Sequence, residues 1–131
     1  MTDQDRKDED YPLNDEASEQ FILSIQSPKS KVRGPHAVVF TDAREGWAIV
    51  ALHWANEPRL GIRWFWGTMG NPISTGHRTW FIIPSGLSDA ILSGLPLSVR
   101  LRRLLDEFLY KGDNEAALTQ WQADKWPKQT G

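Results

Sequence analysis

The chain has no cysteine among its 131 residues. This absence excludes disulfide bonds, thiolate catalysis, and zinc or iron–sulfur sites with cysteine ligands. A cysteine-free protein suits a reducing compartment, so we expect a cytoplasmic location. The length fits a single domain that buries roughly two-thirds of its unfolded surface. Its 40% of hydrophobic residues can supply that core.

Long hydrophobic runs are also missing. No segment approaches the roughly 20 apolar residues that a membrane-spanning helix needs. The first 20 residues hold no apolar stretch of the kind that a secretory signal peptide carries. We therefore expect no membrane partner.

Charge is unevenly distributed, although the net charge is only −2 at pH 7. Residues 1–20 hold eight acidic and two basic residues, whereas residues 21–131 hold nine acidic and 13 basic ones. A polar acidic segment predicts a disordered arm, which we place at residues 1–13, ahead of a single domain at residues 14–131. The alternative is an arm that folds back on a basic surface of the domain.

Strand signals dominate the middle of the chain. Four segments rich in β-branched and aromatic residues are separated by turn-forming residues, which is typical of an antiparallel meander. These segments are residues 36–42, 46–55, 59–67 and 77–84.

Helix signals precede and follow these strands. The expected helices are residues 14–26, starting at Asn14 or Asp15; 85–95, starting at Ser85 or Ser88; 96–112; and 113–126. Residues 14–26 also alternate as a strand would, so their type stays open. The sequence predicts an α+β fold, in which a four-stranded antiparallel β-meander packs against C-terminal α-helices.

Side-chain alternation sorts the strand residues onto two faces if the turns pair Asp42 with Trp47 and Trp54 with Arg59. The first, here called the Trp/Ile face, collects Val38, Phe40, Trp47, Ile49, Ala51, Leu60, Ile62, Trp64 and Trp66. The second, here called the arginine face, collects Val39, Thr41, Ala48, Val50, Leu52, Trp54 and Phe65 with Arg59 and Arg63.

Neither face is polar, so helices on one side would leave a large apolar patch exposed. We expect the Trp/Ile face to be the core. The arginine face then has two interpretations of equal weight. It is a contact surface, because tryptophan, phenylalanine and arginine mark interface hot spots, or the N-terminal helix covers it. In the first case, changing Trp54 or Arg63 to alanine should weaken association without unfolding the protein.

The nine-residue loop 68–76 is a candidate binding loop because of its length. Residues 70–79, GNPISTGHRT, resemble a phosphate-binding loop only superficially, since the glycines are one residue too far apart and His77 stands in place of lysine. The expected binding residues on the arginine face and this loop are Trp54, Arg59, Arg63, Phe65, Asn71, His77 and Arg78.

Histidines offer the one hint of a metal. Alternation places His36 opposite His53, where two imidazoles are able to hold a metal ion or respond to pH. His77 is expected at the other end of the sheet, and no HExxH-like spacing exists. We therefore predict neither a metal site nor a cofactor. Ser85 lacks the frame of a catalytic serine, and no other motif indicates catalysis.

These observations predict a non-enzymatic binding or regulatory protein that acts through its aromatic/arginine sheet face by protein–protein contact or homodimerisation. Nucleic-acid binding is the first alternative, supported by basic residues and sheet aromatics and weakened by the modest positive charge. A small-molecule site or enzyme that uses loop 68–76 is the second.

Overall fold

The protein is described from a computed structural model that covers residues 13–112 and 114–127. The expected acidic arm falls almost wholly on residues 1–12, outside the described residues. Leu13, which the sequence analysis places in the arm, is buried in the core. Within the described ranges, no helix combines the length and the apolar character needed to cross a bilayer.

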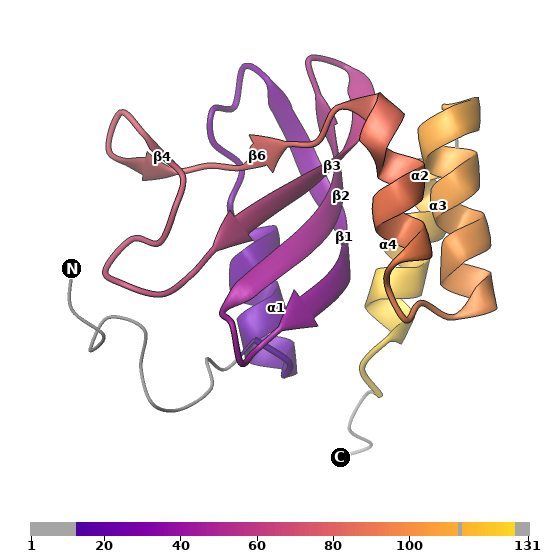
Figure 1. The fold of residues 1–131 in the computed structure, drawn as a ribbon, viewed down its shortest axis with the longest axis horizontal. Coiled ribbons are helices and arrows are strands. Elements are labelled where there is room, and N and C mark those ends of the chain that lie inside the picture. The colour runs from indigo at the N-terminus through magenta and orange to yellow at the C-terminus, as the bar shows by residue number, and fades with distance from the viewer. Residues whose placement is uncertain (1–12, 113, 128–131) are drawn as a thin grey trace.

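The fold has one main sheet with helices on both sides (Figure 1). Strands β1, β2, β3 and β6 form it in that order, all antiparallel, and β4 pairs with β5 in a separate hairpin. This arrangement confirms the predicted α+β fold. In chain order the elements are α1 (Glu16–Leu23), β1 (Val32–Asp42), β2 (Trp47–Trp54), β3 (Glu57–Trp64), β4 (Ile73–Ser74), β5 (His77–Arg78), β6 (Phe81–Ile82), α2 (Ser85–Ser93), α3 (Val99–Lys111) and α4 (Glu115–Asp124).

Strand pairing agrees with the prediction at the first hairpin, where Asp42 lies opposite Trp47. At the second hairpin Trp54 lies opposite Glu57 instead of Arg59. The turn there consists of two residues, Ala55 and Asn56, with φ angles of 51° and 69°. Positive φ at both positions is the signature of a tight two-residue hairpin turn. The resulting shift of two residues leaves every side chain of β3 on its predicted face.

Two other strand features differ from the prediction. A bulge between Val38 and Phe40 puts Val39 on the Trp/Ile face and Val38 on the arginine face, the reverse of the predicted order. The predicted strand 77–84 is broken into β5 and β6 around Trp80. That indole is buried and donates a hydrogen bond from Nε1 to the carbonyl of Ile25 at 2.9 Å, so the chain leaves the ladder to place it in the core.

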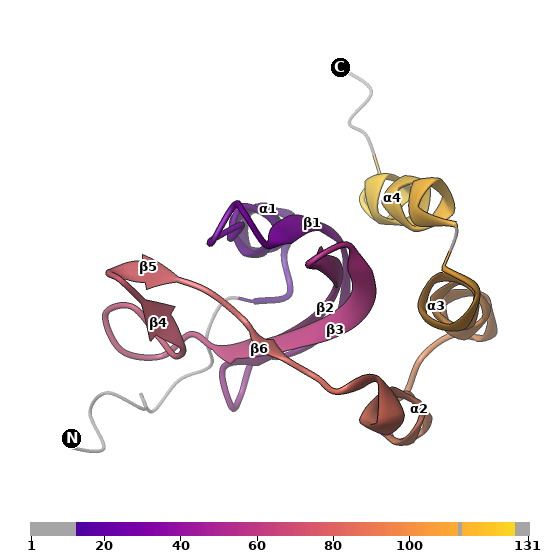
Figure 2. The same cartoon turned by 90° about the horizontal axis from the view of Figure 1, so that it is seen from above.

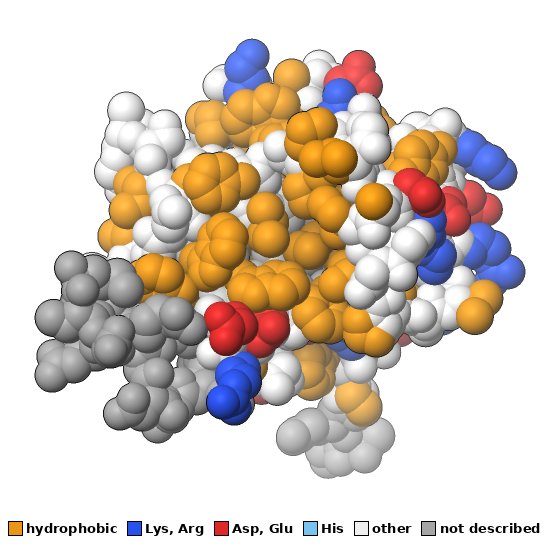
Figure 3. All heavy atoms as spheres, viewed as in Figure 1, with side chains coloured by type: hydrophobic (Ala, Val, Ile, Leu, Met, Phe, Trp, Pro, Cys, Tyr) orange, Lys and Arg blue, Asp and Glu red, His pale blue; other side chains and the backbone are white. Residues whose placement is uncertain are grey.

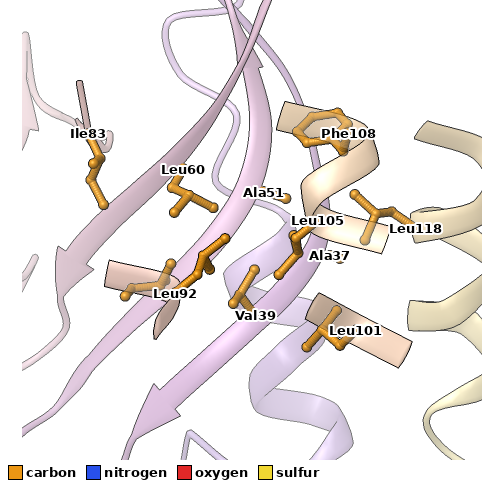
Figure 4. Packing of buried hydrophobic residues seen from close by; sticks show 11 residues of the cluster. Ala37, Val39, Ala51, Leu60, Ile83, Leu92, Leu101, Leu105, Phe108 and Leu118 are labelled. Atoms are coloured by element: carbon orange, nitrogen blue, oxygen red, sulfur yellow. The ribbon is translucent and has the colours of Figure 1, made fainter. Parts of the chain in front are cut away.

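The Trp/Ile face packs against α2, α3 and α4, as Figure 4 shows for the side chains that meet between sheet and helices. Helix α3 supplies Leu101, Leu105 and Phe108 at the i, i+4 and i+7 positions expected from its leucine pattern. It begins after Ser98, whose Oγ accepts a hydrogen bond from the amide of Leu101, and ends at Gly112 with φ 69°. Helix α2, in contrast, follows Pro84 and takes its cap from neither Ser85 nor Ser88.

The arginine face is covered by α1, which lies on the side of the sheet opposite to α2–α4 (Figure 2). Ile22 of α1, fully buried, and Ile25 just after it pack in one cluster with Val50 and Leu52 of the sheet. Asp15 caps this helix by accepting a hydrogen bond from the amide of Ser18 at 2.7 Å. Of the two interpretations of this face, cover by the N-terminal helix is the one that the structure has.

Helix α4 closes the outer edge of β1. The amide of Val38 donates to Gln122 Oε1 at 2.8 Å, and Lys125 Nζ donates to the Val38 carbonyl at 3.2 Å. Both side chains also bind the carboxylate of Glu19 in α1, with donor–acceptor distances of 2.7 Å from Gln122 and 3.0 Å from Lys125. Side chains thereby satisfy both backbone groups of Val38 on the edge strand, and α1, β1 and α4 are tied together.

Replacing Ile22 by alanine tests whether α1 is a structural layer. We expect a loss of about 2–5 kcal/mol in the free energy of unfolding, because a fully buried isoleucine leaves a cavity. Gln20→Ala, an exposed position on the same helix, should change it by less than about 0.5 kcal/mol. Denaturant unfolding measures both, and an equally small effect of the two substitutions would contradict the role of α1.

Candidate functional site

Arg63 lies in the interior of the protein, although the sequence predicts it as a contact residue. Its residue exposure is 0%. Nη1 donates to the carbonyls of Thr79 and Pro72 at 2.7 and 3.1 Å, and Nη2 donates to that of Met69 at 2.6 Å. Burial lowers the pKa of this guanidinium to about 10, so it stays charged at neutral pH. Arg63 holds the segment 68–79 from inside, and its burial removes it from any contact surface.

Two more of the selected residues meet at this end of the arginine face. The ring of Phe65 lies 5.1 Å from the Arg63 guanidinium and packs edge-on against Phe21 at 6.2 Å. The guanidinium of Arg78 lies 5.1 Å from the Phe21 ring. Phe21, 43% exposed, belongs to the same group of contacting side chains. It was not among the predicted binding residues, because the sequence left open whether its segment is a helix or a strand.

The remaining selected residues are dispersed. Asn71 and His77 are exposed, in the loop and in β5. Trp54 and Arg59 are half-buried beside the tight turn at residues 55–56, at the far end of β2 and β3 from Phe65. The seven residues therefore do not form one continuous site.

Another aromatic surface lies on the Trp/Ile face, toward the hairpin at residues 42–47. Trp47 lies opposite Trp64, and Ile62 lies opposite Phe81, so each pair shares a face. The ring of Phe40 lies 5.5 Å from that of Trp47. We call this surface the aromatic belt: Phe40, Trp47, Ile62, Trp64 and Phe81.

Helices α2–α4 cover the Trp/Ile face only in part, and the belt lies at the edge of the covered area. Further along the same face, Ala51 and Leu60 are fully buried under α2–α4. Each residue of the belt keeps part of its surface in solvent, and Phe81 is 45% exposed. Figure 3 shows hydrophobic side chains gathered at the centre of the molecule, over β3 and β6.

A third group consists of titratable side chains, of which the two histidines are buried. His36 Nε2 and His53 Nδ1 lie 2.8 Å apart, within hydrogen-bond distance, so the two rings are neighbours as predicted. The predicted register is wrong, because His53 lies opposite Arg33 and not opposite His36. Glu115, the first residue of α4, brings its carboxylate to 3.7 Å from His36 Nδ1 and 3.9 Å from His53 Nδ1. Arg33 donates a hydrogen bond to that carboxylate.

Burial and a hydrogen bond shift the pKa values in this group. Desolvation lowers the pKa of His36 to about 4 and also lowers the pKa of His53. The hydrogen bond from Arg33 lowers the pKa of Glu115. At neutral pH the cluster consists of two neutral imidazoles and a carboxylate, which are three groups with lone pairs to share.

Comparison with protein-family models, with curated proteins and with solved structures found no match to this chain. The functional assignment therefore rests on the geometry of the aromatic belt and of the buried cluster.

Arg63→Met tests the structural role of the guanidinium. We expect a loss of about 3 kcal/mol or more in unfolding free energy, because three carbonyls lose a charged donor while the buried volume is kept. Limited proteolysis should cut the variant faster within residues 68–79. Arg59→Met, on the same strand, should cost less than about 1 kcal/mol, and similar losses for both variants would contradict this role.

Proposed function

We propose that this protein is a non-enzymatic binding protein that acts by protein–protein contact through the aromatic belt. The observation that carries the proposal is the partial exposure of aromatic rings on a face whose remainder is sealed by helices. Contiguous apolar surface with tryptophan and phenylalanine at its centre is the composition of interface hot spots.

A second copy of the chain is the partner that this chemistry fits best. The belt carries no charged side chain, so two belts meet without electrostatic repulsion. A two-fold dimer covers both at once, because each copy offers the same patch to the other. The cytoplasm is the compartment that we propose, since the chain has no cysteine that an oxidising environment would link.

Nucleic-acid binding has weaker support. Three of the basic residues that suggest it are engaged within the fold: Arg63 is buried, Arg33 pairs with Glu115, and Arg102 pairs with Asp89 and Asp106. A small-molecule site inside segment 68–79 is also disfavoured, because the Arg63 guanidinium occupies its interior.

A matched pair of substitutions tests the belt. Phe81 in the belt and Phe21 on the arginine face are almost equally exposed, at 45% and 43%. We expect Phe81→Lys to weaken dimerisation at least about tenfold, since burying an unpaired ammonium in an apolar contact is costly. Phe21→Lys should leave the dimer intact. Sedimentation equilibrium measures the dissociation constants, and circular dichroism checks the fold.

Each other outcome excludes a specific part of the proposal. A monomeric wild-type protein rejects the second copy as partner. A dimer weakened only by Phe21→Lys moves the contact to the arginine face. A dimer that neither substitution weakens rejects both surfaces. An oligonucleotide that co-purifies with the protein and dissociates steeply with salt favours the nucleic-acid alternative.

A further inference from the structure

The buried cluster of His36, His53 and Glu115 has the composition of a transition-metal site. The three side chains come from β1, β2 and the start of α4, and one ligand atom from each lies within 4.8 Å of the others. Two imidazoles and one carboxylate are a ligand set that proteins use for Zn²⁺, with water in the fourth position. The hydrogen bond between the rings uses one nitrogen of each imidazole, and the carboxylate lies closest to the other nitrogen of His36.

The backbone is shaped to bring His36 into this position. The ladder between β1 and β2 is interrupted between Arg33 and Ala37, and Gly34 has φ 97°. A Cβ on Gly34 would lie 3.0 Å from Cε1 and 3.1 Å from Nδ1 of the His36 ring, so a side chain there would displace it. Irregularities of this kind re-aim a side chain beside functional sites.

The three side chains have to move closer together to share one metal ion. Metal–nitrogen bonds of about 2.0–2.1 Å at tetrahedral angles put two ligand atoms about 3.3 Å apart. His36 Nε2 and His53 Nδ1, at 2.8 Å, are closer than this, whereas the carboxylate lies 3.9 Å from the same His53 Nδ1 and 3.7 Å from the other nitrogen of His36, Nδ1. One ligand atom from each residue lies within 4.8 Å of the others, so changes of up to about 1.5 Å in these separations form the site.

The residues around the His36 and His53 rings hold these rings in place and leave one of them next to a cleft. Phe108 packs edge-on against both imidazoles, with ring centroids 5.7 Å from His36 and 5.1 Å from His53. A cleft of about 320 Å³ between α1 and α4 has His36 among its lining residues. A fixed apolar wall and an open side suit three protein ligands with an exchangeable water.

We propose that His36, His53 and Glu115 bind one Zn²⁺ or a similar divalent transition metal, with water as the fourth ligand. The metal replaces the hydrogen bond between the rings. The displaced proton moves to the other nitrogen of the donating imidazole, so both rings remain neutral and no net proton is released. Arg33 is half-exposed and leaves the carboxylate as the metal takes the charge.

Titration of the metal-free full-length protein with zinc chloride, followed by calorimetry, tests the site. We expect one Zn²⁺ per chain and no binding of magnesium chloride, because imidazole ligands select transition metals. Cobalt chloride should give the intense visible bands of four-coordinate Co²⁺. His53→Gln and Glu115→Gln should each lower zinc affinity at least about tenfold, because the loss of a direct ligand costs no less than the loss of an outer hydrogen-bond partner.

Matched controls keep the result specific. His77→Gln removes an exposed histidine and Glu57→Gln an exposed carboxylate, and both should bind zinc as the wild type does. Circular dichroism checks each fold. If His53→Gln does not fold, Glu115→Gln decides, since that side chain is 39% exposed. Absence of zinc binding, or equal affinity in the wild type and Glu115→Gln, would overturn the three-ligand site.

Discussion

A sheet that is apolar on both faces has to be covered twice, and this requirement organises the whole chain. Ala48, Val50 and Leu52 face one way, and Ile49 and Ala51 face the other. The chain meets the demand with α1 before the strands and α2–α4 after them. Their joint anchor is the buried carboxylate of Glu19, which receives hydrogen bonds from side chains of α4 that also satisfy the edge of β1. The aromatic belt is a part of the sheet that this cover leaves partly exposed.

Arg63 shows that an arginine beside aromatic rings has a different role in a core than on a surface. On an exposed strand, an arginine beside aromatic rings marks a contact surface. Here the long segment 68–79 points three backbone carbonyls inward, those of Met69, Pro72 and Thr79, and a guanidinium donates to all of them at once. Its charge is kept because these acceptors replace water. The irregular loop and the buried arginine therefore stabilise each other.

The periodicity of the sequence predicted those features that depend on interactions between residues near one another in the chain. The leucine spacing of α3 and the pairing of Asp42 with Trp47 follow from helical repeat and alternation. Alternation also predicted that His36 and His53 are neighbours, but the break in the ladder between Arg33 and Ala37 is what brings their rings together. The break at Trp80 and the bulge at Val38 depend on what packs above the sheet, which alternation does not report. Glu115 was missed for a related reason. It stands 62 residues after His53, and only the docking of α4 brings them together.

The docking of α4 also couples the edge of the sheet to the buried cluster. Glu115 at its first turn faces the two histidines, and Gln122 and Lys125 at its end hold β1. A ligand that binds Glu115 together with His36 and His53 binds only the state in which α4 is docked. By mass action such a ligand stabilises that state over any in which the helix has separated from the sheet. Through α4, binding at the cluster would therefore also favour the contacts that Gln122 and Lys125 make with β1.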